Sequence, residues 1–179
     1  MKRLILLFLA GIAFSCNNQG TDSKSVMKDS STTTISSDKT MNYPYTIEHP
    51  DYWQVGSNAN TLTALTALKT WELGKMDESL KYFGDSIRVQ FDGLDKKMSN
   101  DSLKAMFSNG WNSYKTLNIK MEDWESVVSN DKKEEWVTLW YTQHWETKTG
   151  VKDSVAVIND LKIKEGKIVR LDEYTRKLH

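Results

Sequence analysis

The sequence predicts one α+β domain in which three amphipathic helices come before a meander of antiparallel strands. Apolar residues recur mostly at helical spacing over residues 61–114, and they alternate with polar residues over 117–176. Helices and strands that are segregated along the chain are typical of α+β rather than alternating α/β architecture. The length of 179 residues has room for one such domain plus extensions.

The first helix is predicted over residues 61–73. Asn58 or Asn60 is available as its N-terminal cap, and Gly74 can close its end. Its apolar face holds Leu62, Leu65, Leu68 and Trp71.

Two further helices flank a first strand. A short helix at 76–83 ends before Gly84, and residues 87–91 then alternate between apolar and polar side chains as a half-buried strand does. The third helix is expected to begin after Ser99, which is a favourable cap. Its apolar face is the longest periodic pattern in the chain, formed by Leu103, Met106, Phe107, Gly110, Trp111 and Tyr114.

Four more strands are predicted, separated by turns. The polar cluster 129–133 and Gly150 mark two of these turns, and Glu165-Gly166 is typical of a two-residue hairpin. The strands cover residues 117–121, 134–148, 154–164 and 167–176.

The strand at 134–148 has large apolar side chains on both faces, which predicts a central strand covered on both sides. Either the aromatic lead-in at 41–56 or a second copy of the domain can supply the second cover. One face holds Trp136, Thr138, Trp140, Thr142 and His144, and the other holds Val137, Leu139, Tyr141, Gln143 and Trp145.

The N-terminus reads as a secretory signal. Lys2 and Arg3 precede an apolar run over 4–14, which is shorter than the roughly 20 residues that span a bilayer. The run ends in AFSC, which resembles the lipobox of bacterial lipoproteins and makes Cys16 the predicted lipid-bearing residue. An ordinary secretory signal followed by a chance cysteine is the alternative.

The predicted organisation is therefore a signal peptide at 1–15, a lipidated Cys16 with a flexible Ser/Thr-rich tether at 16–40, the lead-in at 41–56 and the domain at 57–179. It predicts a lipid anchor in a bacterial cell envelope. No acidic run follows Cys16, and such a run is what surface-exported lipoproteins tend to carry. We therefore expect an outer-membrane protein that faces the periplasm.

The charge balance and the absence of known motifs exclude several classes of function. The 24 basic and 24 acidic residues balance, and no basic block would track a nucleic-acid backbone. The sequence has no nucleophile elbow, no phosphate-binding glycine loop and no histidine pair at metal spacing, so neither a cofactor nor a metal is expected.

The stretches TWELGKMDESLKYFGDSIRVQFDG at 70–93 and INDLKIKEGKIVRLDEYTRK at 158–177 resemble the nuclear-transport-factor-2-like, or SnoaL-like, superfamily. With the lipobox and the segment NYPYTIEHPDYW, the chain resembles the lipoproteins of that superfamily in Bacteroidota. The resemblance implies a curved sheet wrapped around the helices, a conical cavity between them and, in many members, a homodimer through the outer sheet face. Members include isomerases, dehydratases and purely binding proteins, so the fold does not specify the function.

Comparison with the ketosteroid-isomerase branch implies which side chains face this cavity. A small apolar ligand would then be bound by polar groups set among apolar walls. The alternative is that His144 and Asn159 only form hydrogen bonds with each other or with the backbone inside a filled core. The implied inward residues are Trp140, Thr142, His144, Glu146, Val155, Val157, Asn159, Leu161, Leu171 and Glu173, and Trp111 is added from the third helix.

The catalytic groups of that branch are not retained. Its base corresponds to Gln90 or Phe91, its helix tyrosine to Ala67 and its second acid to Asn159. An enzyme would instead need His144 as a base, oriented by Glu173 or Glu146.

The sequence therefore favours a membrane-anchored, non-catalytic domain that binds a small molecule or a protein. The alternative is a lyase or isomerase acting on a small hydrophobic substrate.

Overall fold

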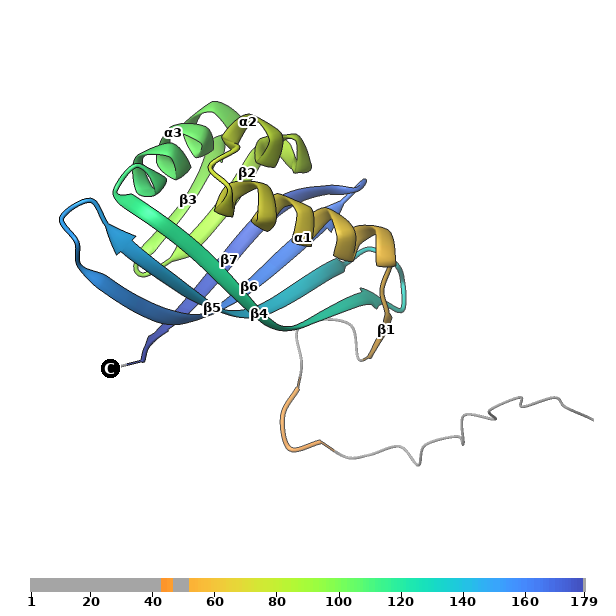
Figure 1. The fold of residues 1–179 in the computed structure, drawn as a ribbon. Helices are drawn as coiled ribbons and strands as arrows, with labels where there is room; N and C mark the ends of the chain where they lie inside the picture. The colour runs from red at the N-terminus through yellow and green to blue at the C-terminus, as the bar shows by residue number, and fades with distance from the viewer. Residues whose placement is uncertain (1–42, 47–51, 179) are drawn as a thin grey trace, which may run out of the picture. The chain divides into compact units, whose positions relative to one another are not determined.

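The computed structural model describes residues 43–46 and 52–178. It shows one curved seven-stranded sheet with its helices gathered on the concave side (Figure 1). This is the α+β architecture that the sequence predicts. No helix in the described part of the chain is long and apolar enough to span a membrane.

The helices occupy nearly the predicted positions. The first, α1 (Asn58–Glu72), is capped by Ser57, whose hydroxyl accepts a hydrogen bond from the Ala59 amide at 3.1 Å, so the prediction of Asn58 or Asn60 as the cap was wrong. The short α2 (Met76–Ser79) runs into a 3-10 turn, η1 (Leu80–Tyr82).

The third helix, α3 (Asn100–Trp111), is capped by Ser99 as expected, because the Ser99 hydroxyl accepts from the Ser102 amide at 3.2 Å.

The strands form the sheet in the order β1-β4-β5-β6-β7-β2-β3. Neighbouring strands are antiparallel except for β2 and β7, which are parallel. Two strands escaped the sequence analysis, the three-residue β1 and the edge strand β3, and β4 is much longer than predicted. The bounds are β1 (Trp53–Val55), β2 (Phe83–Phe91), β3 (Leu94–Ser99), β4 (Tyr114–Ser129), β5 (Glu135–Thr147), β6 (Lys152–Lys164) and β7 (Lys167–Lys177).

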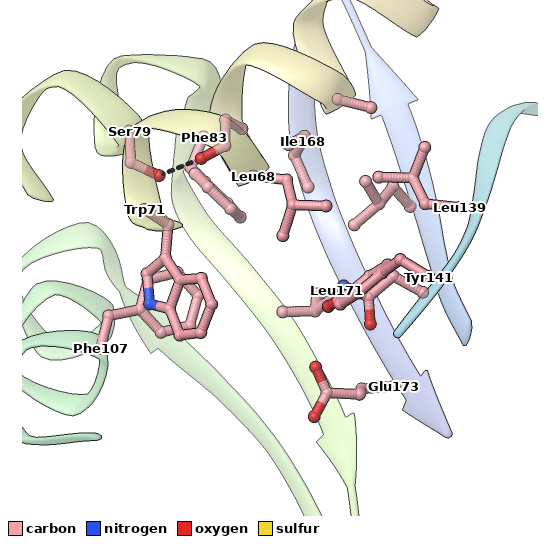
Figure 2. Close-up of a pocket in the computed structure, with 14 residues that line it drawn as sticks. Leu68, Trp71, Ser79, Phe83, Phe107, Leu139, Tyr141, Ile168, Leu171 and Glu173 are labelled. Carbon is pink, nitrogen blue, oxygen red and sulfur yellow. Dashed lines mark hydrogen bonds between the residues drawn. The ribbon is translucent and has the colours of Figure 1, made fainter. Parts of the chain in front are cut away.

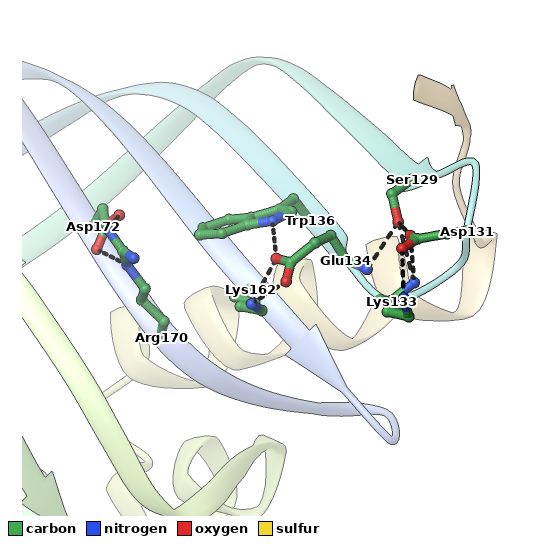
Figure 3. Close-up of polar contacts among 8 residues, drawn as sticks. All are labelled: Ser129, Asp131, Lys133, Glu134, Trp136, Lys162, Arg170 and Asp172. Atoms are coloured by element: carbon green, nitrogen blue, oxygen red, sulfur yellow. Dashed lines mark hydrogen bonds and ion pairs between the residues drawn. The ribbon is translucent and has the colours of Figure 1, made fainter. Parts of the chain in front are cut away.

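The three turns that join β4, β5, β6 and β7 were predicted correctly, whereas the turn between β2 and β3 was missed together with β3. Between β4 and β5, the buried Ser129 hydroxyl donates to Asp131 at 2.6 Å and accepts from the backbone amides of Lys133 and Glu134 (Figure 3). The hydrogen bond from Ser129, reinforced by Lys133, lowers the pKa of Asp131 to about 2. Between β6 and β7, Glu165 and Gly166 both have positive φ, as a two-residue hairpin requires.

The loop between β5 and β6 decides which face of β5 meets the helices. The Thr147 amide bonds to the Val151 carbonyl at 2.8 Å, which leaves three residues in the loop, and Gly150 supplies the positive φ that the turn needs. Tyr141 consequently stands opposite Val157 and Leu139 opposite Asn159. Odd-numbered residues of both strands therefore share the concave face.

The core lies between this concave face and the helices. Val137, Leu139 and Tyr141 of β5 are buried there against Ala64 and Ala67 of α1. On the other face of β5, Trp136 and Trp140 are partly exposed, because no helix covers that side within the described residues (Figure 1).

Candidate functional site

The candidate site is a cavity between α1, α3 and the concave face of β5, β6 and β7 (Figure 2). Its volume is about 70 Å³, and it opens to solvent at its mouth. A concave, mostly apolar pocket with a few polar groups is the usual form of a small-molecule site. Apolar side chains form most of the wall: Ala64, Ala67, Leu68, Trp71, Phe83, Phe107, Leu139, Leu161, Ile168 and Leu171.

Tyr141 and Asn159 are two of the polar groups in this wall. The Asn159 side-chain amide donates a hydrogen bond to the Tyr141 hydroxyl at 3.0 Å, and both residues are buried. The other end of the amide, Asn159 Oδ1, is buried without a hydrogen-bond partner in the structure. A buried acceptor without a partner costs about 1–3 kcal/mol, and a hydrogen bond from a donor relieves that cost.

Glu173 carries the carboxyl group of the cavity. It extends from β7 directly opposite Asn159 on β6, and Figure 2 shows its carboxylate on the cavity side of the sheet. Burial raises the pKa of Glu173, and no opposing charge offsets that effect. The nearby carboxylate also adds to the burial that raises the pKa of Tyr141.

Two further polar groups, the Ser79 hydroxyl and the Trp71 indole N–H, belong to residues that line the cavity. The Ser79 hydroxyl is already used, because it donates to the Ala67 carbonyl at 2.8 Å and ties η1 and α2 to α1. The Trp71 indole N–H is buried without a partner, but in Figure 2 it lies on the Phe107 side of the ring, away from Glu173.

The predicted site residues of β5 do not face the cavity. Trp140, Thr142 and His144 lie on the convex face of β5, where His144 is exposed and Thr142 donates a hydrogen bond to Glu122 at 2.6 Å. The prediction that they point inward was wrong, because the three-residue loop before β6 puts Leu139 and Tyr141 there instead. His144 is consequently no candidate for a base in this cavity. Glu146, also expected inward, forms ion pairs with Lys115 and Lys152.

The remaining predicted residues are placed as follows. Asn159, Leu171 and Glu173 line the cavity. Val157 lies in the buried core beside it. Trp111 lies at the end of α3, where its indole N–H donates to the Glu72 carbonyl at 3.3 Å, and it does not reach the cavity wall.

Sequence reasoning missed Tyr141, Trp71 and Phe107 as cavity residues. Trp71 and Phe107 were assigned to apolar helix faces, and their edge-to-face contact, with ring centroids 6.4 Å apart, joins α1 to α3 at one side of the cavity. Tyr141 follows from the strand alternation once the correct face is chosen.

The convex face of the sheet carries a separate polar network (Figure 3). The cationic groups of Lys162 and Arg170 lie 5.7 and 5.5 Å from the ring centroid of Trp136, and both pair with acids, Glu134 and Asp172. Such contacts are typical of a solvated but ordered surface. The pairing of this face with a second copy stays a prediction.

Two other expectations concern groups outside this cavity. No cluster of three or more histidine, cysteine or acidic side chains suited to a metal occurs among the described residues. Cys16, the predicted lipidation site, lies outside those residues.

Proteins similar to this chain were found by comparing structures, not sequences. No family model matches the sequence, and no curated protein matches it. Among solved structures, a nuclear-transport-factor-2-like protein of unknown function from an Exiguobacterium species is similar, with a TM-score of 0.54 and 14% identity over 64% of this chain and 98% of that one. A nuclear-transport-factor-2-like protein from Burkholderia pseudomallei has a TM-score of 0.56 and 9% identity over 67% and 92%.

The chain has a nuclear-transport-factor-2-like fold. A third structure similar to it is that of a Mycobacterium tuberculosis protein in complex with estradiol-17β-hemisuccinate, with a TM-score of 0.54 and 12% identity over 66% of this chain and 94% of that one. At these identities the likeness shows the fold alone. Within this nuclear-transport-factor-2-like domain, the open cavity and its carboxyl group are features of this chain's own residues.

Proposed function

We propose that the domain binds a small, largely apolar molecule in the cavity between α1, α3 and β5–β7. The observation that carries this proposal is the pocket itself: where a well-packed core leaves few gaps larger than a water molecule, a pocket of about 70 Å³ that opens to solvent remains among apolar side chains and a few polar groups. The similar Mycobacterium tuberculosis protein, whose structure contains estradiol-17β-hemisuccinate, supports a ligand of this general kind.

An NMR titration with naphthalene tests the proposal. We expect the backbone amides of Leu139 and Tyr141 and the indole N–H of Trp71 to shift as naphthalene enters. The variant Leu68→Trp should lose these shifts, because the larger side chain fills the space that Leu68 borders (Figure 2).

The matched control is Leu62→Trp, which places the same side chain on the same helix at a position that is 66% exposed. It should bind naphthalene as the parent does. Shifts confined to the convex face, or no saturable shifts at all, would contradict the proposal.

A second candidate function is a lyase or isomerase, and one observation favours it. Glu173 has a raised pKa, has no partner that neutralises its charge, and shares the cavity with the Tyr141 hydroxyl, so it could transfer a proton to or from a bound substrate. Glu173 takes the role that the sequence analysis gave to His144. Mass spectrometry of a ligand recovered after incubation distinguishes the two: an enzyme returns a product that Glu173→Gln no longer forms.

We also propose that Cys16 anchors the domain to the outer membrane, facing the periplasm. The support is the apolar run that ends at Cys16 and the Ser/Thr-rich segment that separates it from the domain. A bacterial host fed a labelled fatty acid should label the parent chain but not Cys16→Ala. An unlabelled parent chain would contradict the anchor and favour an ordinary secretory signal.

A further inference from the structure

The hydrogen bonding of Asn159 determines which end of its side-chain amide, the oxygen or the nitrogen, is available to a ligand. Its Nδ2 is committed to the Tyr141 hydroxyl at 3.0 Å, so the amide presents its oxygen as the free end. The side chain is only 6% exposed, it lines the cavity, and its Oδ1 has no partner. This acceptor is therefore shielded from bulk water, and a donor group on a molecule in the cavity would pair with it.

Glu173 adds a second acceptor beside the first. The two residues are direct cross-strand partners on β6 and β7 and share the concave face. Side chains in such pairs have Cβ atoms about 4.5–5.5 Å apart, which is close enough for one small group to contact both. When it is ionised, the Glu173 carboxylate accepts hydrogen bonds only, so one donor group placed between the two residues serves both acceptors.

The rest of the wall restricts the ligand further. The Ser79 hydroxyl is engaged by the Ala67 carbonyl, and most of the remaining lining is aliphatic or aromatic. A ligand with several polar groups would therefore leave some of them unpaired against apolar atoms, which is costly. A molecule that is complementary to this cavity therefore has an apolar framework with one hydrogen-bond donor at one end.

We propose that the cavity selects apolar molecules that carry a hydroxyl or amine group, and that this group donates hydrogen bonds to Asn159 Oδ1 and the Glu173 carboxylate. This inference rests on the proposed function, because it names the chemical class of the ligand for the same cavity. Selection arises because a molecule without a donor leaves the buried acceptors unpaired.

Three probes of nearly the same shape test the inference by calorimetry or NMR: naphthalene, 2-methoxynaphthalene and 2-naphthol. Only 2-naphthol can donate a hydrogen bond. We expect it to bind at least about tenfold more tightly than 2-methoxynaphthalene, the scale of one well-formed hydrogen bond to a buried or charged acceptor. Equal binding of the two, or tighter binding of 2-methoxynaphthalene, would overturn the inference and leave the proposed function intact.

Variants assign the preference to the two acceptors. Asn159→Leu should reduce the preference for 2-naphthol over 2-methoxynaphthalene to about twofold or less. Glu173→Leu, at the partly exposed end of the cavity, provides the same readout if Asn159→Leu does not fold. A preference that survives in Glu173→Leu, and in Asn159→Leu where that variant folds, would overturn the assignment.

The matched control is Thr142→Val, which removes a buried polar group from the opposite face of β5 and should keep the full preference. Failure of all three probes to bind the parent protein would refute the proposed function, and the inference with it.

Discussion

Replacing Leu139 by Asp is expected to prevent the domain from folding. Leu139 is fully buried on the concave face of β5, where it faces the helices and the cavity wall. A carboxylate at this position would have no partner and no access to water, so its burial costs several kcal/mol. Since the total stability of a domain is about 5–15 kcal/mol, we expect no cooperative thermal transition by circular dichroism.

The matched control introduces an aspartate five residues away on the same strand. His144→Asp places the carboxylate on the exposed convex face of the same strand, where the change in stability should stay within about 0.5 kcal/mol. If Leu139→Asp folded normally, or if both variants were equally damaged, the assignment of the two faces of β5 would be refuted.

Replacing Trp71 by Ala is expected to lower the free energy of unfolding by about 3 kcal/mol, near the lower end for a large aromatic side chain because one side of the ring borders the cavity rather than packed atoms. The loss comes from the edge-to-face contact with Phe107 and from the contacts that join α1 to α3. Chemical denaturation of the parent and variant proteins measures it.

Trp71→Phe separates the ring from its N–H group. The N–H is buried without a partner, so its removal relieves a desolvation cost and offsets part of the packing loss. We therefore expect Trp71→Phe to be clearly less destabilised than Trp71→Ala. A Phe variant as unstable as the Ala variant would show that the N–H has a partner in solution.

Predictions from local patterns succeeded where the pattern was long and the residues were adjacent. The apolar face of α3 and its Ser99 cap are examples, because helical spacing and capping are both set within a few residues. The three-residue β1 is too short to establish an alternation, and the edge strand β3, with the sequence LDKKMS, was missed because apolar and polar residues do not alternate along it.

The prediction of the cavity-facing residues was correct on β6 and β7 but wrong on β5. On β6 and β7 the inward residues Asn159, Leu171 and Glu173 were identified from the family comparison. On β5 the comparison chose the wrong face, because Trp140 and Tyr141 are equally plausible core residues and a shift of one position exchanges them.

The sequence by itself determined the α+β class, the three helices, the turns and the supply of aromatic residues, since each of these depends on neighbours along the chain. Only the tertiary structure decided that Tyr141 and Asn159 meet next to Glu173 while His144 lies in solvent. The physical reason is that the number of residues in the β5–β6 loop sets the register, and register determines which side chains face the cavity.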